Sequence, residues 1–317
     1  MTATRTNTGR PRPSWFTRFW AVVRYEMLWN IRKKKFIGTV IIAFIFATLS
    51  WVLPVVLSAT TDQPINANPD FAVTFTIPAF GMFLFALITA MNSISSEFES
   101  GTIVPLLTKP VSRTMVFLGK LLAAFIIILV TYTILFVYVV IGGALVYGPQ
   151  NNLHLFPLGL FGNILSTFVW IAIILAAGAL SKSTIISTLV ALGFFIGILF
   201  AVPIVSLFAG PSPALNYVPG SGASGTMITT QGPITVGAGT DNIGANLINY
   251  ALYPSANVDF NRTSISIQGG QPSITQTFAY AEPISLVTAR SFAMAATYAI
   301  VFLIITWIAF KRAQVLE

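Results

Sequence analysis

The chain contains no cysteine and a single histidine, His154, among its 317 residues. Without cysteine it can form no disulfide and has neither a thiolate metal ligand nor a cysteine nucleophile. A lone histidine also excludes histidine-rich metal sites and triad chemistry, and we expect His154 to be a solvated loop residue. We therefore predict no catalytic residue and no metal site in this chain.

Charged residues are also scarce, at 8% of the chain against 55% hydrophobic residues, and the mean hydropathy is +0.82. These values lie far outside the usage of soluble globular proteins and indicate an integral membrane protein. The expected spans contain no Asp, Glu or His at depth, and we expect Lys120 and Arg290 to snorkel from span ends. A proton-coupled carrier is therefore disfavoured, although polar helix breaks that bind sodium leave an ion-coupled carrier as an alternative.

A phosphate-binding loop is missing as well. Gly119-Lys120 lacks the upstream glycine and the Ser or Thr of the Gly-x-x-x-x-Gly-Lys-Ser/Thr pattern. The chain has no P-loop route to ATP hydrolysis, so any ATP-driven work needs energy from another polypeptide.

The remaining sequence divides into a few regions. Residues 1–13 are predicted to be a disordered tail, and 14–35 an amphipathic helix at the membrane interface, with apolar residues at three- and four-residue steps. The interfacial residues of that helix are Trp15, Trp20, Arg32, Lys33, Lys34 and Lys35.

The apolar runs predict an all-α integral membrane protein with six transmembrane helices, five of them within residues 36–209. The spans are Phe36–Ser58, Phe71–Ser95 (with kinks at Pro78 and Gly81), Thr114–Tyr147, Pro157–Leu180, Thr184–Ala209 and Ile284–Phe310. The sixth span, within residues 284–310, is followed by a short tail, 311–317.

Residues 210–283 are rich in Gly, Ser, Thr, Asn and Pro and contain no run long enough to cross a bilayer. We expect a small extracellular domain or lid there, with a helix at Asn242–Leu252 and a hairpin of Ser264–Gln268 with Ser273–Ala279. Asn261 begins an Asn-x-Thr sequon, which is either a glycosylation acceptor in a host such as an archaeon or a chance occurrence.

The cations mark the topology. Of the 17 Lys and Arg residues, all but Arg262 and Arg290 fall on one side of a six-span layout. The positive-inside rule then places both termini in the cytoplasm of a multi-pass protein of a prokaryotic, possibly archaeal, plasma membrane. The charge of +8 is thus a topology signal that favours contact with membrane lipids, and nucleic-acid binding has no support.

Polar residues within the spans are candidates for a substrate path, namely Asn92, Tyr132, Asn163 and Ser166. The alternative for each is an ordinary interhelical hydrogen bond. Several span glycines favour close helix approach, and the Gly193-x-x-x-Gly197 pattern is a weak indication of dimerisation.

The stretch from Asn92 to Lys120, between the second and third spans, is the only long polar interruption on its side of the apolar chain. Its pattern is a Glu-Phe-Glu-Ser-Gly-Thr sequence followed by a Leu pair, a Pro-x-x-Arg and a Gly-Lys. This order and spacing resemble the first cytoplasmic loop of type-2 permeases of ATP-binding cassette (ABC) transporters. The residues that the resemblance assigns to coupling with the ATPase are Glu97, Glu99, Gly101, Thr102, Leu106, Leu107, Pro110 and Arg113.

The resemblance implies a permease that binds no cofactor, while separate ABC ATPase subunits carry ATP and Mg. Residues 96–113 would be the coupling element, and a second permease copy or homologue would complete the transporter. An apolar interior suits export of an amphiphilic or hydrophobic substrate. The remaining alternative is a membrane anchor or scaffold for a surface assembly.

Overall fold

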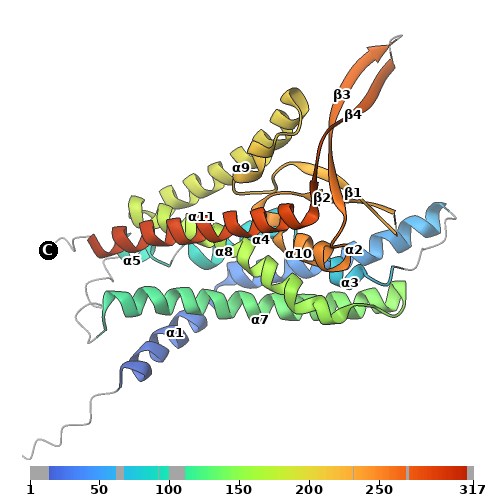
Figure 1. Cartoon of the computed structure of the whole chain (residues 1–317). Helices are drawn as coiled ribbons and strands as arrows, with labels where there is room; N and C mark the ends of the chain where they lie inside the picture. Colours follow the sequence, from blue (N-terminus) through green and yellow to red (C-terminus); the bar gives the residue numbers. More distant parts are fainter. Residues whose placement is uncertain are drawn as a thin grey trace, which may run out of the picture.

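The computed structural model describes residues 14–61, 68–91, 93–99, 111–230, 232–268 and 271–312. Figure 1 shows a bundle of long helices that carries a β-sheet at one end, with the short helix α5 and the last turn of α11 at the opposite end. We refer to these as the sheet end and the loop end of the bundle.

Five helices in the described ranges are long and apolar enough to cross a membrane. They are α2 (Lys34–Thr61), α7 (Arg113–Tyr147), α8 (Phe156–Ser181), α9 (Thr184–Ala209) and α11 (Ile284–Arg312). Each agrees with a predicted span to within about three residues at either end. The chain is therefore a mostly helical, multi-pass membrane protein.

The predicted second span is not one helix. Phe71–Thr74 form α3, the backbone is not helical at residues 75–78, and α4 (Ala79–Ala90) follows. Pro78 has no backbone N–H, and it precedes the first residue of α4, a position where proline is tolerated. The helix does not merely kink at Pro78 as expected but is interrupted there. The prediction that the second of the six spans, Phe71–Ser95, is one continuous helix is therefore wrong.

The predicted interfacial helix is present as α1 (Trp15–Ile31), which begins after Ser14. The Ser14 Oγ accepts a hydrogen bond from the backbone N–H of Thr17, which satisfies one of the donors at the helix start. Trp15 and Trp20 are exposed, whereas Val23 is fully buried against α7. The helix is amphipathic as expected, and it ends before a bend that leads into α2.

The segment between α9 and α11 carries a four-stranded antiparallel sheet in the order β2-β1-β3-β4. Its strands are β1 (Ser224–Thr229), β2 (Gly232–Gly237), β3 (Asn257–Gln268) and β4 (Gln271–Pro283). The β3–β4 pair confirms the predicted hairpin, although both strands are longer than the sequence indicated. The β1–β2 pair was not predicted, because its short strands are rich in Gly and Thr and carry little apolar alternation.

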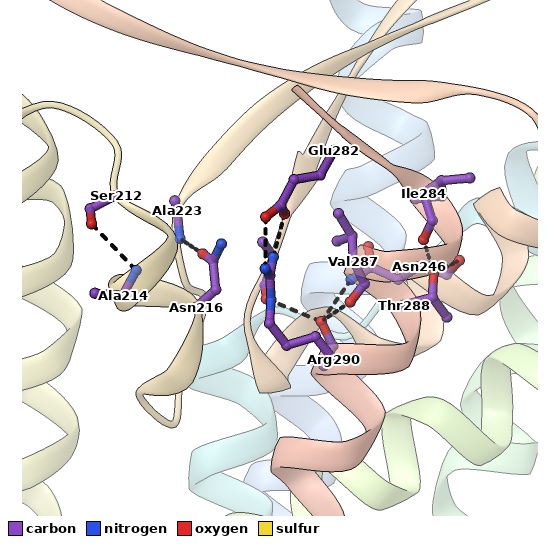
Figure 2. A network of polar contacts seen from close by, with 12 residues as sticks. Ser212, Ala214, Asn216, Ala223, Asn246, Glu282, Ile284, Val287, Thr288 and Arg290 are labelled. Carbon is purple, nitrogen blue, oxygen red and sulfur yellow. Dashed lines mark hydrogen bonds and ion pairs between the residues drawn. The ribbon is translucent and has the colours of Figure 1, made fainter. Parts of the chain in front are cut away.

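A network of polar contacts ties this sheet to α11 (Figure 2). The two guanidinium Nη atoms of Arg290 donate to the two carboxylate oxygens of Glu282 at 2.8 and 2.6 Å. The Thr288 hydroxyl on the same helix donates to the carbonyl oxygen of Asn246 at 3.1 Å. The expectation that Arg290 snorkels toward lipid headgroups is therefore wrong, because a nearby carboxylate satisfies its charge inside the protein.

The same segment also reaches into the helix bundle. A short 3₁₀ turn, η3 (Thr240–Asn242), and the predicted helix, α10 (Ile243–Leu252), pack against α8. A Cβ atom built on Gly162 of α8 would collide with the backbone of Gly244, so the two helices touch at their main chains. Glycine at both positions permits this approach, and the segment is more than an external lid.

This contact gives a matched pair of glycine variants. Gly162→Ala should lower the free energy of unfolding by about 1–3 kcal/mol, because the methyl group meets main-chain atoms that cannot move aside easily. Gly193→Ala on α9, where nothing lies within 4 Å, should be neutral or stabilise the protein by up to about 1 kcal/mol. Thermal unfolding of the purified protein in detergent measures both, and equal shifts would contradict the close α8–α10 contact.

Candidate functional site

The predicted coupling element is described only at its two ends. Gly101, Thr102, Leu106, Leu107 and Pro110 lie outside the described residues, as does the side chain of Glu97. Helix α5 (Ser95–Glu99) precedes this gap and Arg113 follows it at the start of α7. The coupling role of these residues stays a prediction, but the contacts of α5 and Arg113 show what such a loop would act upon.

Helix α5 rests on the turn between α8 and α9. The Thr184 hydroxyl donates to the Ser95 Oγ at 3.2 Å, and the Ser183 hydroxyl donates to the Glu99 carboxylate at 3.0 Å. Hydrogen bonds from Thr184 and Ser183 lower the pKa of the Glu99 carboxyl, which keeps this exposed group ionised. The first residues of α9 are thus joined directly to the beginning of the predicted coupling element.

Arg113 joins the start of α7 to the end of α11. Its Nη1 atom donates to the carbonyl oxygens of Phe310 at 3.3 Å and Lys311 at 2.9 Å. Carbonyl groups in the last turn of a helix lack partners within that helix, so a guanidinium group stabilises them well. The start of α7, which follows the predicted loop, is therefore tied to the last turn of α11.

A buried ion pair joins α1 to α7. The Lys120 ammonium donates to the Glu26 carboxylate at 2.6 Å, and the side chains are only 4% and 8% exposed. The expectation that Lys120 reaches the lipid headgroups is wrong, because α1 covers this face of α7 and supplies the opposite charge. Burial without that charge would be costly, so the pair holds α1 in one position on α7.

Lys33 extends this network at the bend between α1 and α2. Its ammonium donates to the Asn30 side-chain oxygen at 2.8 Å, and the Asn30 amide donates to the carbonyl oxygen of Glu26 at 3.1 Å. Burial lowers the pKa of Lys33 to about 8, while the charge of Glu26 acts in the opposite direction. Arg32, Lys34 and Lys35 are exposed, and their contact with lipid headgroups stays a prediction.

Three of the four predicted path residues bridge elements within the bundle. The Tyr132 and Thr167 hydroxyls are 2.7 Å apart between α7 and α8. The Asn163 side-chain oxygen accepts from the backbone N–H of Ile77 at 3.2 Å, and the Ser166 hydroxyl donates to the carbonyl oxygen of Thr240 at 2.7 Å. Asn92 lies outside the described residues, and contact of any of the four with a substrate is untested.

These bridges belong to a polar face of α8 that the sequence analysis did not assemble. Asn163, Ser166, Thr167 and Trp170 recur at steps of three and four residues, so they share one side of the helix. Trp170 donates its indole N–H to the Asp241 carboxylate at 2.9 Å. The spacing was a usable signal, but nothing in the sequence indicated that Asp241, 71 residues further along, would meet it.

Asp241 is therefore the functional candidate that sequence reasoning missed. Asp241 is 5% exposed, and its carboxyl group lies beside Trp170 in the middle of α8 although the residue belongs to the segment between α9 and α11. The long helices themselves carry no acid at depth, as expected, but a connecting turn brings one to that position.

Asp241 borders a cavity of about 420 Å³ between α9, the start of α4 and the sheet segment. Its wall on α9 is largely apolar, from Phe195 to Leu207, and the opposite wall carries polar side chains that include Asn261 and Thr263 of β3. Asn261 is half-buried there, and its glycosylation stays a prediction. A cavity with one apolar and one polar wall suits an amphiphilic molecule.

The ion pair generates a prediction about stability. Glu26→Gln leaves the Lys120 ammonium buried without its counter-charge and should lower the free energy of unfolding by about 3–5 kcal/mol. Replacing both partners by Met should recover most of that loss, since no buried charge remains. Thermal unfolding in detergent tests this, with the exposed Arg24→Met variant as control; a double variant no better than Glu26→Gln would contradict the pairing.

Lys33 generates a prediction about pH. Its pKa is lower in the folded protein than the ordinary value of 10.5, so between about pH 8 and 10.5 the unfolded chain binds more protons. Stability should therefore rise with pH across that window, and Lys33→Met should flatten the rise while stabilising the protein at pH 7. Melting temperatures measured from pH 7 to pH 10 check the slope, and exposed Lys34→Met should leave it unchanged.

A comparison with protein families gives a match that covers nearly the whole chain. A family model described as "ABC-2 family transporter protein" matches residues 20–315. The comparison with curated proteins found no match.

Proposed function

Because the chain belongs to the ABC-2 family of transporter proteins, it is a membrane-spanning permease of an ABC transporter, and we propose that separate ATPase subunits drive it through residues 96–113. The family implies ATPase partners. The proposal concerns where they act, what they move and in which direction.

The contact that supports this proposal most strongly is the one between α5 and α9. Ser95 and Glu99 are hydrogen-bonded to Thr184 and Ser183 at the beginning of α9, and the far half of α9 forms the apolar wall of the cavity. A displacement of α5 by an ATPase would therefore act on the helix that lines the cavity. Figure 1 shows α9 diverging from α11 toward the sheet end.

The other helices at the loop end would either move together with α5 or stay in place while α5 moves. Arg113 links the far end of the loop to α11, and the Glu26–Lys120 pair holds α1 on α7. We propose that α1, α7 and α11 form the frame against which α5 and α9 are displaced.

We propose that the loop end faces the cytoplasm and the sheet end faces outward. The cations Arg113, Lys182 and Lys311 gather at the loop end, in keeping with the positive-inside rule. The broken segment α3–α4 would act as the sixth crossing, since it joins α2 at the sheet end to α5 at the loop end. Within the break, the backbone N–H of Ile77 donates to the buried Asn163 side chain, which satisfies this main-chain donor inside the protein, as a membrane requires.

We propose export of an amphiphilic or hydrophobic substrate as the transport activity. The cavity lies at the sheet end of α9 and has one apolar and one polar wall. A second copy of the permease or a homologue would complete the transporter, with the exposed apolar side of α9, including Leu189, Gly193 and Phe200, available to it or to lipid.

The coupling assignment predicts a physical association. Full-length tagged protein purified from its own host should bring down an ATPase with a P-loop, and Glu97→Ala or Gly101→Ala should reduce the recovered ATPase several-fold. Arg312→Ala, which removes an exposed charge at the same end of the bundle, should not. Quantitative mass spectrometry of the purified complexes measures the ratio, and full ATPase recovery with both loop variants would refute the assignment.

A further inference from the structure

The cavity beside α9 contains a buried acid that the bundle only partly satisfies. One carboxylate oxygen of Asp241, Oδ1, accepts the Trp170 indole N–H at 2.9 Å. The other oxygen has no hydrogen-bond partner within the described part of the chain, and the residue borders the cavity. Asp241 is only 5% exposed, and a buried carboxylate with a single neutral donor is unfavourable unless it is protonated or meets a cation.

No cation lines the cavity among the residues that the structure describes. Among the described residues that line the cavity, Asp241 is the only one with a titratable side chain, on α4, α8, α9, the Gly220–Gly222 turn or β3. Arg262 is next to two lining residues, but its guanidinium group is exposed and donates to the carbonyl oxygen of Phe208. A counter-charge for Asp241 would therefore come from a molecule that enters the cavity.

The turn that carries Asp241 is held in place from several sides. The backbone N–H of Asp241 donates to the carbonyl oxygen of Gly220 at 3.0 Å, and the Thr240 hydroxyl accepts the Gly220 N–H at 2.9 Å. A Cβ on Gly239 would collide with the Gly220–Gly222 turn, so two glycine-rich turns touch at their main chains. The carboxylate is thus fixed in position, as a binding site requires.

Aromatic rings lie next to the acid. The rings of Trp170 and Phe195 pack edge to face with centroids 5.1 Å apart, and both residues border the cavity. From Phe195 to Leu207 the wall on α9 is apolar apart from Ser206, over about 18 Å at 1.5 Å per residue.

We propose that this cavity binds an amphiphile with an ammonium headgroup, which pairs with Asp241 while its apolar chain lies along α9. A metal ion fits poorly, because it needs several oxygen ligands and Asp241 is the only carboxylate among the described lining residues. An anionic amphiphile would bring a second negative charge to a buried acid. The inference names the substrate class for the proposed transport, and only that link rests on the proposed function.

Binding of dodecylamine to the full chain in phosphatidylcholine nanodiscs tests the inference, with empty nanodiscs subtracted. Dodecylamine should bind, and dodecanoate, which has an equally long chain and the opposite charge, should bind at least about tenfold more weakly. Asp241→Asn keeps an acceptor for Trp170 but removes the charge, so it should weaken dodecylamine binding about tenfold or more. Asp259→Asn removes a charge on the same segment away from the cavity and should leave binding unchanged.

Two further measurements test where dodecylamine binds and what kind of molecule the natural ligand is. Val202→Trp should fill the cavity and abolish dodecylamine binding without affecting the fold at the loop end. Adding phosphatidylethanolamine to the nanodiscs should compete if the natural ligand is a membrane lipid with an ammonium group, and should have no effect if it is a free amine.

Unchanged dodecylamine binding in Asp241→Asn or Val202→Trp would overturn the inference, as would equal binding of dodecanoate or of dodecanol. Dodecanol binding equal to that of dodecylamine would mean that Asp241 is a neutral hydrogen-bonding group. None of these measurements uses ATP or an ATPase. Failure of the proposed transport would therefore leave a positive binding result standing, and the reverse also holds.

Discussion

The fold depends on one constraint, which is that main-chain polar groups inside the bundle must find partners within the protein. The polar face of α8 provides them. Asn163 accepts from the backbone at the α3–α4 break, and Ser166 donates to the backbone of the turn that carries Asp241. Without these two side chains, a broken helix and a 3₁₀ turn would leave unpaired groups in an apolar environment, at a cost of several kcal/mol each.

The same two side chains explain why a segment between two spans can enter the bundle. Helix α10 occupies space along α8 and α11 at the sheet end, where α3 is only a single turn long. Gly162 and Gly244 allow the main chains of α8 and α10 to touch, and the resulting position of Asp241 creates the polar end of the cavity. The break in one span and the insertion of another segment are therefore two parts of one arrangement.

Much of this fold could be predicted from the sequence, because long apolar runs with clear polar ends dictate the spanning helices α2, α7, α8, α9 and α11. The β3–β4 hairpin could also be predicted, because apolar and polar residues alternate on either side of Gly269-Gly270. The interruption at Pro78 was underestimated, since a proline near the start of an apolar run indicates a kink as well as a break. The Glu26–Lys120 pair and the Asp241–Trp170 contact could not be foreseen, because 94 and 71 residues separate the partners and no local pattern links them.

Some groups that contact α8 lie far from it in the sequence. This separation affects the order in which the contacts can form during synthesis of the chain. Asn163 meets Ile77, which precedes it, but Ser166 and Trp170 wait for a turn that is synthesised more than 70 residues later. Long apolar helices enter the bilayer one after another as translation proceeds, so α8 resides in lipid before η3 and α10 exist. During that interval Ser166 and Trp170 lack the partners they have in the finished fold, so this side of α8 is completed only after the segment between α9 and α11 is made.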